Sequence, residues 1–396
     1  MQQTSDSQAG LTGHLLLLLA SLAALGSLAT NIILPAFPDM AGDLGTSVKD
    51  LSATLASFFV AFALGQLFVG PLSDRLGRKW LVVGGLVVFV AGSALCAFAN
   101  NLPQLIVGRI VQALGVCATS VLSRAIARDL YEGEALSRAL SLIMVAMAAA
   151  PGFSPLLGGV LSSVLGWRST FGLIAALAVL LGIYYLTRLG ETHGSDQRAP
   201  FSALAIVKTY VGLLNDRRFI APAMSVSLVI GSLYMFFSMA PAILMTGFAF
   251  SPLGLSAFFA STVFVVFGAG FLAPRSARRW GQIRVARVGI LIALAGSVAL
   301  WAGPQDIYYF SAAMSVFLLG MGLINPLGTA ITLQPFGQKA GAASALLGFL
   351  QMGFAAIAIA IAIAASLPVP IYEAFSIVLA VNLGLSLLAF WGTPNK

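Results

Sequence analysis

Charged residues are scarce in this sequence, and acidic residues are scarcer than basic ones. Asp, Glu, Lys and Arg make up 9% of the 396 residues, against about a quarter in soluble domains. Hydrophobic residues make up 59%, where soluble proteins have about 45–50% apolar residues. The composition excludes a soluble globular domain and indicates a chain that lies mostly in a lipid bilayer.

Cysteine and histidine are almost absent, which argues against two kinds of site. Cys96 and Cys117 fall in apolar segments, so we expect buried packing and no disulfide framework. His14 and His193 are not part of any Cys/His spacing that would hold zinc. We therefore expect no metal and no cofactor.

Several functional motifs are missing as well. No G-x-x-x-x-G-K-[ST] loop occurs, which argues against an ATP-driven pump. Because the sequence has no nucleotide-binding loop and no Ser-His-Asp order, we do not expect an enzyme. A sensor would need an attached soluble domain, and we expect none. Residues 1–13 contain no Lys or Arg, so the first apolar segment is not expected to be a cleaved signal peptide.

Long apolar segments recur along the whole chain instead. A spanning helix needs about 20 apolar residues, and helices satisfy their own backbone polar groups in lipid. The sequence therefore predicts an all-α membrane protein with twelve transmembrane helices, over about 12–36, 51–73, 80–99, 102–124, 138–165, 167–187, 219–245, 254–274, 284–302, 306–330, 340–366 and 370–391.

The basic residues predict how these helices are oriented. Of the 21 Lys and Arg residues, 18 fall in the even-to-odd loops and the C-terminus, while only Lys49 and Arg168 fall on the opposite face. The positive-inside rule then places both termini in the cytoplasm. The alternative is that the excess of basic charge forms a patch for nucleic acid or lipid, but topology explains it and we expect no nucleic-acid partner.

A polar stretch, residues 187–218, divides the chain into six helices plus six. We expect an N-terminal half over 1–187, a cytoplasmic loop over 188–218 and a C-terminal half over 219–396. Within the loop, residues 203–214 are expected to form an amphipathic helix on the membrane surface.

The two halves carry related loops. "GPLSDRLGRKW" (70–80) follows the second helix and "APRSARRWGQIR" (273–284) the eighth, with Ala277 in the place of Asp74. In the first copy, Gly70 and Gly77 are expected to permit a tight turn and close helix approach. Asp74 is expected to cap a helix end or pair with an Arg. Arg75, Arg78 and Lys79 are expected at the cytoplasmic surface.

These motifs resemble those of the major facilitator superfamily. "GPLSDRLGRK" is similar to its loop 2–3 signature, "RIVQALG" (109–115) to its helix 4 signature and "APGFSPLLGG" (150–159) to the helix 5 signature of proton-coupled drug antiporters, with Ser154 where a Gly is usual. "IARDLYEGEALSRALS" (126–141) and "LQPFGQKAGAASALLGFLQM" (333–352) resemble the bicyclomycin and chloramphenicol resistance branch.

The resemblance implies two pseudo-symmetric six-helix halves, a lumen between them and alternating access, with a proton entering as substrate leaves. It also implies that the loop 2–3 motif, with Asp74 and Arg75, braces helices in the outward-facing state. In helix 5, Pro151, Pro155, Gly158 and Gly159 are expected to form a bent packing seam between the halves.

Arg109 lies inside the fourth predicted helix, where ionisable residues are functional candidates. It is about 10 Å from the outer end of that helix, and Gln112 shares its face. Both are expected to line the lumen, although Gln112 can simply bond between helices. Arg124, near the inner end, is expected to snorkel to the surface.

Asn31 lies at a similar depth in the first helix, just before a Pro-x-x-Pro bend. The resemblance implies an acidic proton carrier here, close to the helix 4 arginine. Asn31 can hydrogen-bond but cannot titrate, and no Asp or Glu lies in the central part of any predicted span.

Three interpretations stay open. The protein is an uncoupled facilitator or exchanger, or it couples protons through a helix-end carboxylate such as Asp74 or Asp39. Alternatively, the amide replaces an original acid and mimics a permanently protonated state.

Further lumen candidates are Tyr234 and Phe237 in the seventh helix, Asn325 beside Pro326 in a locally broken tenth helix, and Gln351 in the eleventh. Packing is an equally good explanation for the aromatic residues. We expect a monomeric inner-membrane exporter of small, largely apolar compounds, powered by the proton gradient, that exports lipophilic cations poorly. The alternative is an exporter of one metabolite, such as a sugar, purine or amino-acid derivative.

Overall fold

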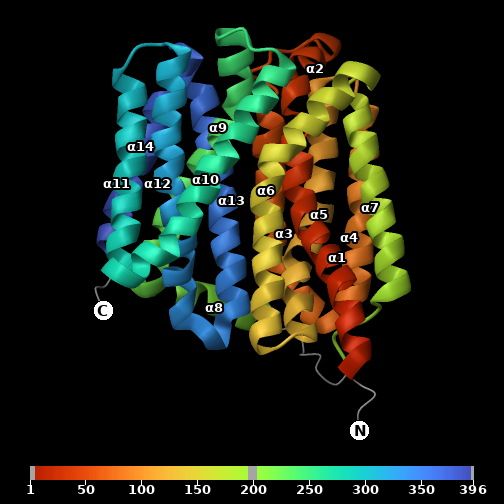
Figure 1. The fold of residues 1–396 in the computed structure, drawn as a ribbon. Coiled ribbons are helices and arrows are strands. Elements are labelled where there is room, and N and C mark those ends of the chain that lie inside the picture. Colours follow the sequence, from red (N-terminus) through yellow and green to blue (C-terminus); the bar gives the residue numbers. More distant parts are fainter. Residues whose placement is uncertain (1–4, 195–202, 394–396) are drawn as a thin grey trace.

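The computed structural model describes residues 5–194 and 203–393 as a bundle of long helices that run between two ends of the molecule (Figure 1). Within these ranges, twelve segments are long and apolar enough to cross a membrane, which confirms the predicted fold class. The first six segments comprise α1 (Ser5–Asn31) with η1 (Leu34–Ala36) and α2 (Phe37–Leu44), α3 (Ser52–Leu76), α4 (Arg78–Ala97), α5 (Leu102–Leu130), α6 (Gly133–Leu165) and α7 (Arg168–Arg188).

The second six follow a short connecting helix, α8 (Ala203–Leu214), which was predicted over the same residues. They comprise α9 (Arg217–Ala240) with η3 (Pro241–Gly247), α10 (Pro252–Trp280), α11 (Gln282–Ala302), α12 (Ile307–Leu333) with η4 (Gln334–Lys339), α13 (Ala340–Ala365) and α14 (Ile371–Trp391). We call the end of the bundle that carries α2 the α2 end. The opposite end, which carries α8, the start of α1 and the end of α14, is the α8 end (Figure 1).

The first spanning segment is not the single helix predicted over 12–36. α1 ends at Asn31, and the chain continues through η1 into α2. Pro35 has no N–H, and its ring clashes with the carbonyl four residues earlier, which belongs to Asn31. The amide at position 31 therefore lies at a helix break.

The two related loops are also shorter than predicted. α3 runs through Pro71 to Leu76 and α4 begins at Arg78, so Gly77 alone separates the helices. Gly77 has a φ of 90° and Gly281, between α10 and α11, has a φ of 84°. Only glycine adopts such a backbone at little cost, and each glycine N–H donates to the carbonyl four residues earlier, in Ser73 and Ala277. Counted from these glycines, Ala277 corresponds to Ser73 and not to Asp74.

Gly70 does not have the predicted role. It lies inside α3, and a Cβ added there would meet nothing within 4 Å. Neither a turn nor a close helix approach requires glycine at this position, because the helix continues past it to Leu76.

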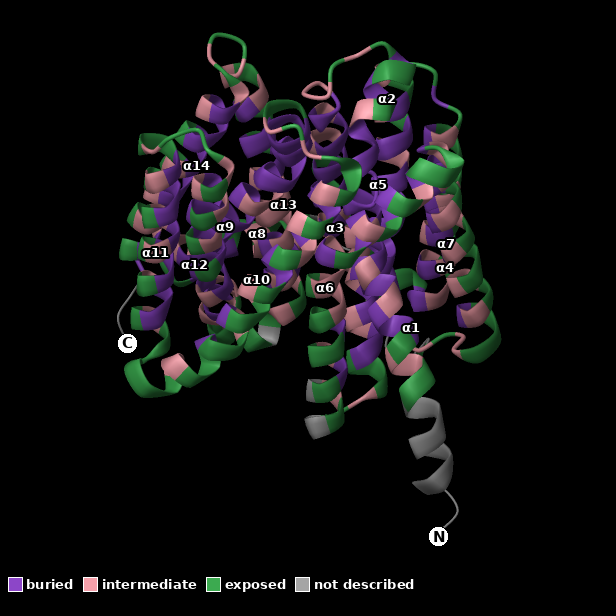
Figure 2. Ribbon diagram, turned by 45° about the horizontal axis from the view of Figure 1, so that its top comes forward, coloured by how far each residue is buried: buried purple, intermediate pink, exposed green. Residues whose placement is uncertain are grey.

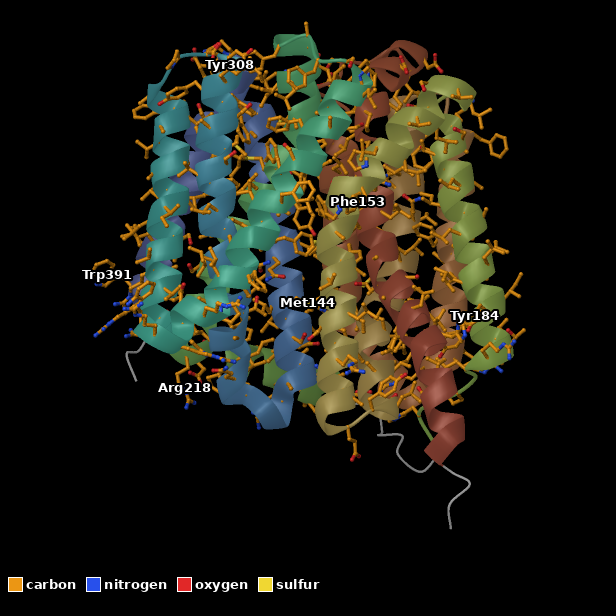
Figure 3. All side chains as sticks on the ribbon, in the orientation of Figure 1. Met144, Phe153, Tyr184, Arg218, Tyr308 and Trp391 are labelled. Carbon is orange, nitrogen blue, oxygen red and sulfur yellow. The ribbon has the colours of Figure 1, made fainter. Side chains whose placement is uncertain are left out.

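Buried residues face inward along the helices, and exposed apolar residues cover the outside (Figure 2). Large exposed aromatic residues lie near both ends of the bundle, as in proteins whose aromatic rings sit at the two membrane interfaces. Tyr308 lies at the α2 end and Trp391 points outward toward the α8 end (Figure 3). This surface is suited to lipid.

Helices from the first and second six pack directly on each other, α3 on α13 and α6 on α10. Toward the α2 end the contacts between them are close. The Ser52 hydroxyl on α3 donates to the Ser238 carbonyl on α9 (2.9 Å), and Ser256 on α10 donates to the Pro155 carbonyl on α6 (2.9 Å). These hydrogen bonds join the two sets of helices at that end.

Candidate transport site

Arg109 on α5 is completely buried and joins several helices. Its Nη1 donates to the Ala29 carbonyl on α1 (3.0 Å) and to the Gln112 side chain. Gln112 in turn donates to the Ser93 hydroxyl on α4 (2.8 Å). The guanidinium also lies over the Phe58 ring on α3, with its Cζ 4.5 Å from the ring centre. Arg109 and Gln112 thus act here as an interhelical polar cluster.

The same guanidinium is not fully satisfied. Nε and Nη2 of Arg109 are buried and have no hydrogen-bond partner among the described residues. Buried donors are almost always paired, and a guanidinium has five of them. The unpaired donors are therefore a place where a ligand or water oxygen can bind.

Asn31 lies close to Arg109 in the chain fold but makes different contacts. Its side-chain nitrogen donates to the Ser27 carbonyl (2.8 Å) and to the Thr30 hydroxyl (3.0 Å), both within α1. Arg109 reaches the backbone of Ala29, two residues before Asn31. Asn31 and Arg109 thus lie at a similar depth, as predicted. Arg109 donates its hydrogen bond to the backbone of α1, however, and not to the side-chain amide of Asn31.

The predicted α6 seam lies where α1 and α10 meet. A Cβ on Gly158 would be 1.7 Å from the Ile32 carbonyl oxygen, directly at the break after Asn31. A Cβ on Gly159 would be 2.9 Å from the Ser256 hydroxyl oxygen. Pro151 and Pro155 lie inside the unbroken helix. Glycine is needed at Gly158 because the backbone of the first span occupies the space of a side chain.

The remaining predicted lumen residues are dispersed. The ring of Tyr234 on α9 lies 4.6 Å from that of Phe59 on α3, and Phe237 packs against Phe236 and Phe259. Asn325 and Gln351 are half-buried on α12 and α13. The predicted break at Asn325 is wrong, because α12 runs through Pro326 to Leu333. No contact brings these four residues to Arg109 in the described part of the chain.

A second polar cluster lies at the α8 end. Arg78 pairs with Asp74 (2.7 Å) and with Asp129 on α5 (3.1 Å), and it also contacts the Ser73 hydroxyl. Arg78 is only 6% exposed, so its predicted place at the surface is wrong. Two carboxylates compensate the guanidinium, which allows it to be buried. Arg75 is exposed, as predicted.

Sequence reasoning missed the part that Glu191 plays in this cluster. Its carboxylate accepts hydrogen bonds from the backbone N–H groups of Arg78 (2.8 Å) and Lys79 (3.3 Å), which are the first two residues of α4. Burial opposes ionisation of Glu191, but the backbone donors of His193, Arg78, Lys79 and Thr192 outweigh it and lower its pKa. No local spacing reveals this cap, because 113 residues separate its two sides.

Tyr210 on α8 was missed as well. Its hydroxyl donates to the Leu67 carbonyl on α3 (3.0 Å). Pro71 lies four residues after Leu67 and has no N–H to offer that carbonyl. The hydrogen bond from α8 thus replaces the one that the proline removes from the helix, and it attaches α8 to α3.

A cavity of about 390 Å³ opens beside this cluster at the α8 end. Asp74, Arg78, Arg124, Arg128 and Asp129 line it from α3, α4 and α5. Residues of α8 and the first turns of α13 line the other side, which includes Tyr210. Of the predicted site residues, Gly70, Asp74 and Arg78 line this cavity, whereas Arg109, Gln112 and Asn31 are buried away from it.

Known proteins match this chain over most of its length. The family model "Major Facilitator Superfamily" matches residues 19–360. Multidrug resistance protein D of Escherichia coli (strain K12) is 30% identical over 85% of each chain. The chloramphenicol resistance protein of Pseudomonas aeruginosa is 34% identical over 82% of this chain and 76% of that protein. YdgK of Bacillus subtilis (strain 168), named an uncharacterized MFS-type transporter, is 32% identical over 86% of each chain.

Solved structures share the fold. A point mutant of the nucleoside transporter NupG superimposes with a TM-score of 0.74 at 16% identity, covering 96% of this chain and 100% of that one. The match over 19–360, the twelve spans and the resistance-protein relatives agree. The chain is a multi-pass membrane transporter, not an enzyme, and it belongs to the major facilitator superfamily.

Proposed function

We propose that this protein exports small, largely apolar compounds, including antibiotics, across the bacterial inner membrane by alternating access. It acts as a monomer with both termini in the cytoplasm and draws its energy from the proton gradient. The orientation rests on the 18 Lys and Arg residues that the sequence places on one face. The compounds are suggested by the multidrug and chloramphenicol resistance relatives.

One observation carries the proposal of alternating access, and the resistance-protein relatives suggest export as the direction. The cavity opens at the α8 end, which is the cytoplasmic end in this orientation. At the α2 end, hydrogen bonds from Ser52 to Ser238 and from Ser256 to Pro155 join the two sets of helices. A cavity that faces the cytoplasm while the other end is closed is one of the two states of alternating access, and in an exporter it is the state that loads substrate.

For the proton step we propose Asp74. Asn31 cannot titrate, and no Asp or Glu lies in the central part of any predicted span, which leaves the carboxylates at helix ends. Asp74 lines the cavity with its side chain 53% exposed and pairs with Arg78. Asp39, the other helix-end candidate, lies on α2 at the opposite end of the molecule. Protonation of Asp74 would weaken its pairing with Arg78, which links α3 to α5 through Asp129.

The test is chloramphenicol-driven proton movement in proteoliposomes that contain a lumenal pH dye, with chloramphenicol uptake measured in parallel. We expect the protein and Asp39→Asn to move both protons and chloramphenicol. We expect Asp74→Asn to move chloramphenicol without protons.

Other outcomes decide between the alternatives. Chloramphenicol transport without proton movement by the unchanged protein would identify an uncoupled facilitator, which the amide at position 31 favours. Proton movement only in Asn31→Asp would place the proton site at position 31. No chloramphenicol transport, with growth-linked release of one compound, would identify a metabolite exporter.

A further inference from the structure

The cavity at the α8 end contains two cations that pair with no residue in the described part of the chain. Arg124 and Arg128 both line it, and neither has a hydrogen bond or ion pair with any described residue. The third guanidinium, Arg78, is engaged by Asp74 and Asp129, the two carboxylates of the same cavity. The wall formed by α5 therefore carries an uncompensated positive charge.

The helix dipole does not explain the position of Arg124 on its helix. Arg128 lies in the last turn of α5, where a cation is stabilised by the helix dipole, but this effect falls off within one turn. Arg124 lies six residues before the end at Leu130. It does not snorkel to the surface as expected, because it is half-buried and turned into the cavity.

The spacing of the two residues adds a second argument. Residues four apart lie on the same face of a helix, and like charges at this spacing repel each other. Arg124 is half-buried and Arg128 is exposed, so the repulsion falls mainly on Arg124, and an anion bound between the two guanidiniums would relieve it. The first turns of α13 line the opposite side of the cavity, and the N-terminus of this helix has no side-chain cap. The positive end of the α13 dipole at that position also favours negative charge.

We propose that Arg124 and Arg128 form a binding subsite for an anionic group, such as a carboxylate or sulfonate, on an otherwise apolar substrate. This inference rests on the proposed function and adds to its substrates a specific class, apolar compounds that carry one negative charge. The apolar body of such a compound lies against Val121, Leu122 and Ala125, which line the same cavity. Arg124 binds the charged group and Arg128 strengthens the local field.

The test uses two probes that share one apolar body, dansylglycine and its neutral amide, dansylglycinamide. Binding is measured by fluorescence to the full chain in phosphatidylcholine nanodiscs. We expect dansylglycine to bind at least about tenfold tighter than the amide, since a hydrogen bond to a charged group is stronger than one between neutral groups. Arg124→Gln removes this preference and leaves the affinity for the amide unchanged, whereas Arg124→Lys keeps part of it. Arg217→Gln, an exposed arginine at the same end outside the cavity, changes neither affinity.

Equal affinities of the unchanged protein for the two probes would overturn the subsite, as would a full preference in Arg124→Gln. If phosphatidylglycerol in the nanodiscs displaces dansylglycine, the arginines hold a lipid headgroup and the substrate assignment is overturned. Transport of neutral chloramphenicol by the same variants is measured separately in proteoliposomes. If the unchanged protein transports chloramphenicol but binds the two dansyl probes equally, only the proposed subsite is overturned. If the unchanged protein shows no efflux, the proposed function fails.

Discussion

The guanidinium of Arg109 donates a hydrogen bond to the backbone carbonyl of Ala29, 3.0 Å away, and thereby ties α5 to the last turns of α1. The contact bridges 80 residues of sequence. It lies one helix turn or less from Asn31, where the first span breaks. Arg109 therefore supports the region in which the first span breaks.

Replacing Arg109 with lysine keeps the charge but removes the planar fork. We expect Arg109→Lys to lose the joint contact to Ala29 and Gln112, which leaves buried polar groups unpaired. The cost is about 1–3 kcal/mol of the free energy of unfolding, measured by denaturation in detergent. A stability equal to that of the unchanged protein would show that charge alone suffices.

Gly158 is expected to tolerate no side chain. Gly158→Ala places a methyl group 1.7 Å from the Ile32 carbonyl oxygen, so α1 and α6 must separate. We expect the free energy of unfolding to fall by roughly 1–3 kcal/mol, the usual cost of overpacking. We also expect the transport rate to fall at least about tenfold. Gly172→Ala on α7 is the control, since a Cβ there meets nothing within 4 Å. Equal activity of the two variants would contradict the close contact.

The link between α8 and α3 can be tested with a double-mutant cycle. Tyr210→Phe removes the donor to the Leu67 carbonyl and is expected to cost about 0.5–1.5 kcal/mol of stability. Pro71→Ala supplies the missing backbone N–H to that carbonyl. Tyr210→Phe should therefore cost much less in a Pro71→Ala background. Additive effects of the two substitutions would show that the tyrosine and the proline act independently.

Glu191 is expected to make stability depend on pH. Its pKa in the folded protein lies below the ordinary value of 4.5, because backbone donors outweigh burial. The ionised carboxylate therefore stabilises the fold above pH 4.5, and this contribution is lost as the pH falls through the folded pKa. Glu191→Gln should lose less stability than the unchanged protein between about pH 7 and about pH 3. Glu132→Gln, at an exposed glutamate, should behave as the unchanged protein does.

Lipophilic cations should be poor substrates. Arg109 has no acidic partner among the described residues, and Arg124 and Arg128 add positive charge to the cavity. Resistance of a susceptible host that expresses the protein is measured against matched neutral and cationic compounds. Strong protection against the cations would contradict the charge argument.

The sequence alone determined the parts of this protein that depend on local composition. Apolar segments of spanning length set the helices, and Gly77 and Gly281 set two sharp breaks. The motifs indicated the family. Partition of a helix into lipid and the φ angle of a glycine are properties of a few neighbouring residues, so they can be read from the chain.

Only the tertiary structure decided which polar groups meet. Arg78 is buried because Asp129 on another helix pairs with it. The Leu67 carbonyl accepts a hydrogen bond from the Tyr210 hydroxyl, 143 residues away in the sequence. Arg124 lines a cavity because α8 and α13 form its opposite wall. Such contacts depend on how distant helices pack, and the same side chain is a surface cation or a binding group according to what lies opposite it.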